Sequence, residues 1–439
     1  MKKKLAVLGL AATMMMSLFA GCGGKGTSGG KNASADKGSV YYLNFKPEAD
    51  AQWQELAKIY TEQTGVPVTV VTAASGDYSN TLNAQMGKDG APTIYNIGNM
   101  SGLKDWDEYA LDLTGTALAG ELATNDFNLY NEAGELKAMG YCYESFGIIV
   151  NTKLLADAGH SLDEIKDFAS LKAVADDIHA RAAELGFDAF SSAGLDSSSS
   201  WRFSGHLANM PLYYEFRDDD VTEQPAEIKG TYLDNFRNIW DLYITDSAAD
   251  PTALSTATGD QSEAEFGEGK AVFYQNGTWE YAALTADKFN LNPDEIAMIP
   301  IYCGVDGEEK AGLCSGTENC WAINSQAKEE DIQASLDFLY WLVTDPDASA
   351  VLVEQLGAVP FKSCPASANK FIVDGNALLA DGKYAVTWAF NYTPNVDSWR
   401  ATVVTALAAY SADPTDANWE AVKTAFVDGW AIEYKTVNG

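Results

Sequence analysis

Apolar and polar positions repeat with two different periods in the chain that follows residue 39. Short runs rich in β-branched and aromatic residues, at 40–45, 66–71 and 93–97, predict strands. Residues 53–60 carry apolar side chains at i, i+3, i+4 and i+7, which predicts an amphipathic helix, and a second helix is predicted over residues 78–86. This β-α-β-α-β order predicts a parallel sheet covered by helices.

The same alternation starts again near residue 141. Residues 141–151 predict an apolar strand, and residues 162–185 have the period of one long amphipathic helix. Later helices are predicted over residues 332–343, 348–356, 398–410 and 418–430. The pattern therefore predicts an α/β chain with two lobes.

The segment before the first strand has the layout of an export signal. Three lysines are followed by an uncharged apolar run, residues 5–20, and by small residues before Cys22. This run is shorter than the ~20 residues that a membrane-spanning helix needs. Residues 18–22 resemble a bacterial lipobox, which implies that residues 1–21 are removed and that Cys22 carries lipid. Residues 22–39, rich in Gly, Ser and Lys, are then expected to form a flexible tether.

A lipid on Cys22 would hold the protein at the outer face of a membrane without spanning it. An ordinary cleaved signal with an incidental cysteine is the alternative interpretation.

Five further cysteines follow, an odd number that excludes a complete set of disulfides. Free, buried thiols are favoured, although one bridge between Cys303 and Cys314 stays open. An exported protein that does not depend on disulfides favours a Gram-positive source.

The acidic composition restricts the partners and cofactors. The 439 residues include 62 acidic and 29 basic side chains, for a formal net charge of −33, and 46% of them are hydrophobic, enough for two lobes. Nucleic-acid binders need basic patches, so no nucleic acid is expected as a partner. With three histidines and no HExxH or CxxC pattern, no metal site is expected. No phosphate-binding G-x-x-x-x-G-K-[ST] loop occurs, and no cofactor is expected.

One segment carries a recognisable motif. Residues 263–281 read EAEFGEGKAVFYQNGTWEY, in which Phe266, residues 269–272 and residues 277–279 are spaced as F-x-x-G-x-A-A-M…G-x-W. This spacing resembles the signature of the family 1 extracellular solute-binding proteins. Four more segments resemble blocks of that family in the same order, at residues 143–153, 320–339, 357–360 and 394–399. The resemblance covers nearly the whole chain after residue 39.

The resemblance implies a two-lobed α/β fold of the periplasmic-binding-protein type. Each lobe would be a mostly parallel sheet flanked by helices, and the chain would cross the hinge near Glu144, Pro300 and Thr344. The implied lobes are residues 40–145 with about 302–344, and about 146–301 with 345–439. The family usually has Pro-Asp after the second helix, whereas this chain has Pro92 and Thr93, so no contact is assigned there.

The resemblance also implies a function without catalysis. Members capture sugars outside the cell for ABC importers, so we expect a monomer that closes on a mono- or oligosaccharide and delivers it to permease subunits. Two alternatives stay open. A lipid-anchored glycoside hydrolase would also line its cleft with tryptophans and carboxylates, and a sensing lipoprotein would report the ligand instead of delivering it.

Tryptophans are the first candidates for a sugar site, because a sugar ring offers an apolar face that a flat indole covers. The motif matches imply stacking roles for Trp279 and Trp399. Trp201 lies where relatives place a binding loop of the second lobe. Each could instead be a core residue, above all Trp399, which has Val403 and Leu407 at i+4 and i+8 on a predicted helix.

Polar candidates would bind the hydroxyl groups. Asn44 and Lys46 end the first strand, where open α/β sheets bind ligands, and Asn99 follows the third strand. Asp77 opens the second helix, where it could equally be an N-cap. The resemblance places Glu144 in a crossing strand facing the cleft. The remaining candidates flank the tryptophans or lie in a glycine-flanked loop: Arg202, Glu280 and Glu318.

Overall fold

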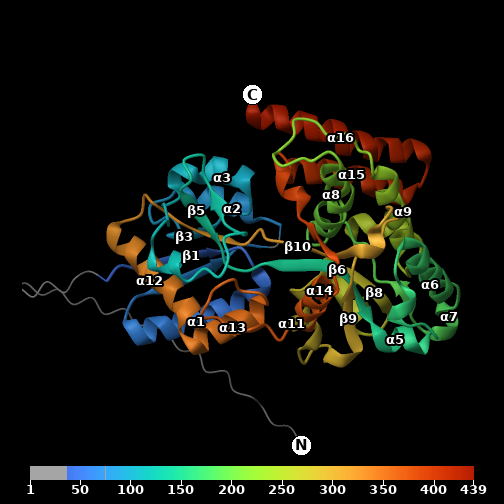
Figure 1. Ribbon diagram of the computed structural model, residues 1–439, viewed down its shortest axis with the longest axis horizontal. Coiled ribbons are helices and arrows are strands. Elements are labelled where there is room, and N and C mark those ends of the chain that lie inside the picture. Colours follow the sequence, from blue (N-terminus) through green and yellow to red (C-terminus); the bar gives the residue numbers. More distant parts are fainter. Residues whose placement is uncertain (1–36, 75) are drawn as a thin grey trace, which may run out of the picture. The chain divides into compact units, whose positions relative to one another are not determined.

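The computed structural model of the protein describes residues 37–74 and 76–439. The predicted export signal, Cys22 and most of the tether lie outside the described residues. Two mixed β-sheets organise the described part of the chain, each with helices on both faces (Figure 1). We call each sheet with its helices a lobe.

The first sheet has six strands. Their order is β2 (Val68–Thr72), β1 (Val40–Asn44), β3 (Ile94–Asn96), β11 (Cys320–Ile323), β5 (Leu136–Gly140) and β4 (Leu129–Tyr130). β1 pairs in parallel with β2 and β3, as the β-α-β-α-β pattern predicts. β11 instead runs antiparallel to β3 and β5, because it enters from the second lobe and not through a crossover helix.

Alternation along β1 decides which helices cover each face of the first sheet. Tyr42 packs in the cluster formed with α1 (Asp50–Thr64), α12 (Glu329–Thr344) and α13 (Pro346–Leu356). Leu43 points to the opposite face, where α2 (Tyr78–Met86) and α3 (Met100–Trp106) contribute the apolar side chains. Both faces of the sheet are therefore covered at β1, as expected for a parallel strand inside a sheet.

The second sheet is built around β6. Its order is β12 (Tyr384–Thr387), β10 (Ala311–Gly316), β6 (Glu144–Asn151), β8 (Ala271–Gly277) and β7 (Asp188–Phe190), and β9 (Ile296–Ile299) also pairs with β6. β6 is antiparallel to β8, β9 and β10, so this sheet is mixed where a mostly parallel one was predicted. All eight residues of β6 are buried, both its apolar run of residues 146–150 and the polar residues Glu144, Ser145 and Asn151.

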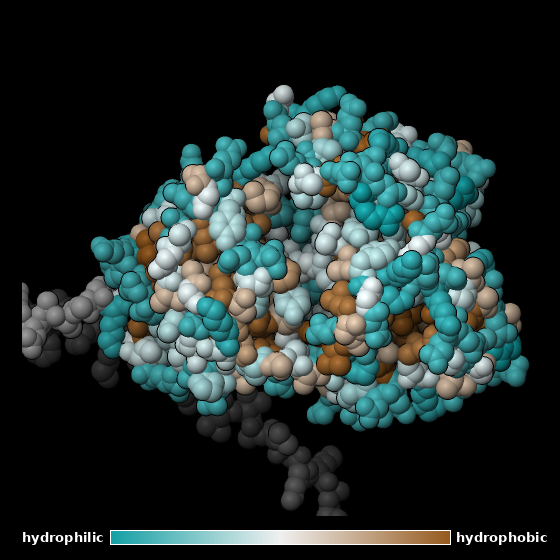
Figure 2. All heavy atoms as spheres, viewed as in Figure 1, coloured by the Kyte–Doolittle hydropathy of each residue, from teal (hydrophilic) through white to brown (hydrophobic). Residues whose placement is uncertain are grey.

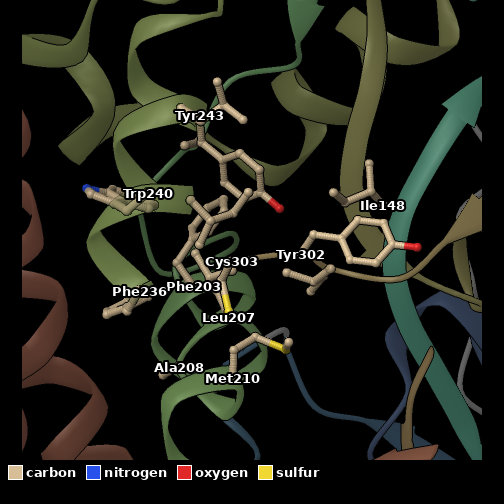
Figure 3. Packing of buried hydrophobic residues seen from close by; sticks show 14 of the residues in the cluster. Ile148, Phe203, Leu207, Ala208, Met210, Phe236, Trp240, Tyr243, Tyr302 and Cys303 are labelled. Atoms are coloured by element: carbon tan, nitrogen blue, oxygen red, sulfur yellow. The ribbon is translucent and has the colours of Figure 1, made fainter. Parts of the chain in front are cut away.

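The helices of the second lobe pack around a large core and a smaller one. They are α5 (Thr152–Asp157), α6 (Phe168–Ala180), α7 (Ala182–Leu185), α8 (Asn209–Asp218), α9 (Leu233–Thr245), α10 (Gly259–Gly267), α11 (Glu280–Thr285), α14 (Lys370–Ala380), α15 (Val396–Ala412) and α16 (Asp416–Asn438). The smaller core receives side chains from α10, α11 and α14. Figure 3 shows how Phe203, Trp240 and Tyr243 pack together in the large core.

The prediction of one helix over residues 162–185 is wrong, because the segment forms two α-helices, α6 and α7, and the first begins only at Phe168. Asp167 and Ser170 form a reciprocal capping box that starts α6 at Phe168, and Arg181 interrupts the helix before α7. A side chain that satisfies the free N–H groups of a first turn sets where the helix begins, whatever the apolar period before it.

The crossings between the lobes differ from the predicted ones at two places. The crossing before Glu144 agrees with the prediction. β9 and β10, on either side of Pro300, both pair with β6, so the next crossing lies at residues 317–319, between β10 and β11. α13 packs in the core of the first lobe, and Phe361 still belongs to that core, so the last crossing follows Phe361 and not Thr344.

The described cysteines are all free thiols. Cys142, Cys303, Cys314 and Cys320 are buried, and Cys364 is partly buried. Within residues 37–74 and 76–439, no helix is both long enough and apolar enough to cross a membrane.

Candidate functional site

Three predicted site residues meet where the chain passes between the lobes. Lys46 Nζ lies 2.7 Å from Glu144 Oε1, and both side chains are 6% exposed. Asn319, in the second crossing, donates its Nδ2 to Glu144 Oε2 at 2.7 Å. Asn44 holds the turn after β1, because its side chain accepts from Lys46 N and donates to Lys46 O. We call Lys46, Glu144 and Asn319 the hinge cluster.

The charges of the hinge cluster compensate one another. Burial lowers the pKa of Lys46, but the carboxylates of Glu144 and of Glu48, 2.8 Å away, outweigh burial and hold that pKa well above its usual range. Both oxygens of Glu144 already accept from protein donors. The cluster therefore ties the end of β1 to the start of β6, which belong to different lobes.

Asp77 and Asn99 are helix-start residues in the first lobe. Asp77 is exposed and accepts from the side chain of Asn80, while Asn99 accepts from Gly102 N at 2.9 Å and caps α3. Asn99 is therefore occupied as an N-cap. Near Asp77, a methyl group on Gly76 would lie 3.1 Å from the carbonyl oxygen of Ser197, so this first-lobe loop closely approaches the loop before Trp201.

Two tryptophans form a corner on the second lobe. The ring centroids of Trp201 and Trp279 are 5.8 Å apart with their planes inclined by 55°, and both side chains are partly exposed. Trp201 Nε1 donates to Ser198 O at 2.9 Å, which fixes that ring. His206 lies behind both rings, at centroid distances of 5.1 and 5.3 Å. We call Trp201 and Trp279 the aromatic corner.

A short π-helix shapes the corner from behind. Trp201 directly precedes η4 (Arg202–Leu207), whose wider turns are common at functional sites. Arg202 is buried, donates to Gln275 O at 2.9 Å and lies 4.8 Å from the ring of Tyr274. Arg202, a predicted site residue, therefore supports the aromatic corner from inside the second lobe, because its guanidinium is already bonded to Gln275 O.

Glu280 follows Trp279 and is partly exposed. Its Oε1 accepts from Asn276 Nδ2 at 2.9 Å. Burial, with a smaller contribution from the charge of Glu263, raises the pKa of Glu280 to about 8, although Arg202 acts in the opposite direction. At neutral pH this carboxyl group is therefore mostly protonated.

Glu318 is joined by a residue that the sequence analysis did not identify. Arg400 Nη2 lies 3.7 Å from Glu318 Oε1, and the two side chains are 18% and 20% exposed. The guanidinium also lies over the ring of Phe390 and against Gly205, at whose α-carbon a methyl group would come within 2.8 Å of Arg400 Nη2. Burial raises the pKa of Glu318, against the opposing effect of Arg400.

The predicted ligand role of Trp399 is wrong. Its side chain is fully buried, its Nε1 donates to Phe426 O at 2.9 Å, and its ring packs edge-on against Phe426 and Trp430. The helical periodicity carried the correct signal, since Val403 and Leu407 are buried on the same face. Arg400, one residue later, lies about 100° around the helix and so points to Glu318 instead.

His206 and Trp388 were also missed. Both are 6% exposed, and their rings continue the row of aromatic side chains from Trp279 to Phe390, which we call the wall. Neither has a sequence motif, so only the fold brings them together.

On the face shown in Figure 2, the surface is hollowed between the lobes. Within the part of the chain that the structure describes, no three His, Cys, Asp or Glu side chains gather as metal ligands.

Comparison with known proteins gives a family and a fold. The profile of the bacterial extracellular solute-binding proteins matches residues 55–371. The maltooligosaccharide ABC transporter solute-binding lipoprotein of Streptococcus pneumoniae serotype 4 is 24% identical over 380 residues, which span 82% of this chain and 80% of that protein.

Two solved structures illustrate the fold. The solute-binding protein RafE in complex with raffinose aligns with a TM-score of 0.73 at 16% identity, covering 90% of this chain and 99% of RafE. The GacH receptor of Streptomyces glaucescens aligns with a TM-score of 0.65 at 19% identity, covering 91% and 98%. These alignments confirm the predicted two-lobed fold.

Proposed function

The chain belongs to the bacterial extracellular solute-binding proteins, and we propose that it captures an oligosaccharide between its lobes for an ABC importer. The motif in residues 263–281 thus predicted the family correctly. Because these proteins bind solutes and do not transform them, the alternative of a glycoside hydrolase is set aside. The observation that carries the proposal is the aromatic corner of Trp201 and Trp279.

The corner suits the C–H face of a pyranose ring. Two partly exposed indole rings inclined by 55° offer one ring face and one flanking wall. Covering such a face removes apolar surface from water, and an indole loses little rotamer freedom in doing so. Maltooligosaccharide and raffinose, which the names of the relatives mention, present such faces.

Polar groups near the corner would select among sugars by their hydroxyl positions. Arg400 and Glu318 are close but 3.7 Å apart, so a sugar hydroxyl could accept from the guanidinium and donate to the carboxyl group. Glu280, held mostly protonated, can donate a hydrogen bond. Lys46 and Glu144 remain proposed contacts only through their position, since they are bonded to each other.

Capture would work by closure of the lobes. Three crossings form the hinge, and the loops at Gly76 and Ser197 approach each other from opposite lobes. A ligand that touches both lobes favours the closed arrangement by its differential affinity.

We propose that the closed monomer then docks on permease subunits, and that lipid on Cys22 keeps it at the outer face of a Gram-positive membrane. The lipoprotein of Streptococcus pneumoniae supports this proposal.

The experiment is a calorimetric titration of residues 37–439 with maltotriose, raffinose, N,N′-diacetylchitobiose and xylobiose, with chromatography of the sugars afterwards. We expect at least one sugar to bind and all to stay intact. Trp279→Ala should weaken binding by about tenfold or more, since a lost stacking face costs about 1.4 kcal/mol or more. Trp341→Ala, a partly buried tryptophan of α12, is the matched control. Hydrolysis of a sugar would overturn the proposal, and failure of every sugar to bind would overturn the substrate class.

A further inference from the structure

Gly277 lies directly beneath the ring of Trp279. A methyl group at its α-carbon would lie 2.2 Å from Cη2, 2.3 Å from Cζ3 and 2.5 Å from Cζ2 of that ring, although real side-chain carbons essentially never come within 3.0 Å. Three adjacent ring carbons at nearly equal distance place this point over the face of the ring, because a point beyond the edge would be much farther from the two outer carbons. The backbone of Gly277 therefore covers one face of the indole.

The backbone conformation does not explain this glycine. Gly277 ends β8, pairs with Phe146 of β6, and is absent from the glycines with positive φ. Alanine could adopt its φ and ψ without strain. What excludes a side chain at position 277 is the space that the ring of Trp279 occupies.

Support on one face decides which face of Trp279 is free. Trp201 and His206 pack against the ring at inclinations of 55° and 51°, and the backbone of Gly277 covers one face. Trp279 is nevertheless partly exposed, and the part of the ring that Gly277 covers cannot account for that exposure. Two other glycines lie close to planar side chains near the aromatic corner: Gly316 lies against Cβ and Cγ of Trp388, and Gly205 lies against the guanidinium of Arg400.

We infer that Gly277 is a positioning residue for ligand binding. Because it has no side chain, the ring of Trp279 can lie against the backbone at the angle that a sugar ring needs. This inference rests on the proposed function. A side chain at position 277 would push the ring out toward the ligand and close the aromatic corner. The effect on binding would pass entirely through Trp279.

Close approach of glycine to an aromatic ring is not by itself functional, and the chain offers a matched control. A methyl group on Gly267 would lie 2.4, 2.5 and 2.7 Å from ring carbons of Phe289, outside the wall. Gly267, like Gly277, has no positive φ. Gly267→Ala therefore introduces the same steric conflict without touching the aromatic corner.

The test is a double-mutant cycle measured by calorimetry with maltotriose and raffinose. We expect Gly277→Ala to weaken binding by about tenfold or more, and Gly267→Ala to leave it within about twofold. In a Trp279→Ala background, where no ring is present to clash, Gly277→Ala should change affinity by less than about twofold. An unchanged affinity for Gly277→Ala beside a weakened Trp279→Ala, or an equal loss in both backgrounds, would overturn the inference.

A ligand-free measurement separates this inference from the proposed function. In protein labelled with 5-fluorotryptophan, the fluorine signal of Trp279 is assigned by its absence in Trp279→Phe. Gly277→Ala should shift that signal and Gly267→Ala should not, and an unmoved signal would overturn the positioning role whatever the sugars do. If no sugar binds, the proposed function falls together with the binding role of Gly277, while the signal still reports on the ring.

Discussion

Replacing Lys46 with methionine would leave the carboxylate of Glu144 buried without its cation. The two side chains are 6% exposed and 2.7 Å apart. Removing one member of such a buried pair costs about 3–5 kcal/mol, because the remaining charge is uncompensated. Asn319 still donates to Glu144 Oε2 in the variant, so we expect the lower end, about 3 kcal/mol. Loss of the contact to Glu48, whose side chain is 37% exposed, adds about 1 kcal/mol at most.

The assay is equilibrium unfolding of residues 37–439 in urea, followed by tryptophan fluorescence. Lys46→Met should lower the free energy of unfolding by about 3 kcal/mol. The double variant Lys46→Met with Glu144→Leu removes both charges and should recover most of that loss, since apolar residues replace buried ion pairs at little cost. Lys153→Met is the matched control, because Lys153 pairs with Asp157 where the side chains are 57% and 49% exposed, and it should cost less than about 1 kcal/mol.

Two results would refute this reasoning. If Lys46→Met stayed within about 1 kcal/mol of the unchanged protein, the pair would behave like a surface ion pair. If the double variant were as unstable as the single one, the loss would come from packing and not from the stranded charge. Either result would remove the hinge cluster as a stabilising contact between the lobes.

Three further predictions concern other parts of the second lobe. Trp399→Ala should destabilise the fold by about 3–5 kcal/mol, as large core truncations do, and leave the sugar affinity of the folded protein unchanged; a selective loss of affinity in calorimetry would argue for a ligand contact. The raised pKa of Glu280, about 8, favours folding fully below the usual carboxyl range and progressively less as pH rises through 8. Melting temperatures from pH 5 to 9 should therefore fall less steeply for Glu280→Gln, and parallel curves would contradict the raised pKa. Residues 37–439 denatured without reductant should titrate as five thiols, whereas three would indicate a bridge between Cys303 and Cys314.

Much of the fold could be predicted because each segment carries its own apolar period. The run 40–45 became β1, with Tyr42 and Leu43 facing opposite helical layers. Residues 53–60 lie in α1, which ends at Gly65 in the left-handed conformation. A period of 3.6 or 2 reflects burial of one face or of alternate residues, and this requirement is local.

The lobe boundaries could not be predicted in the same way. β10 and α13 lie on the opposite side of the hinge from their predicted lobes. An apolar strand has the same sequence pattern in either sheet, so only its hydrogen-bond partners decide which sheet it joins. Cys314 pairs with Phe146, which places β10 beside β6.

By itself, the sequence determined the family and the α/β class, and it singled out Trp201 and Trp279 as candidate ligand contacts, because motifs and apolar periods are properties of neighbouring residues. Only the tertiary structure decided that Trp399 belongs to the core while Arg400 faces Glu318. It also decided that Lys46 and Glu144 neutralise each other across the hinge and that Gly277 lies beneath Trp279. The reason is physical: a side chain's partner depends on distance in space, and the chain brings together residues that lie about a hundred positions apart as readily as neighbours.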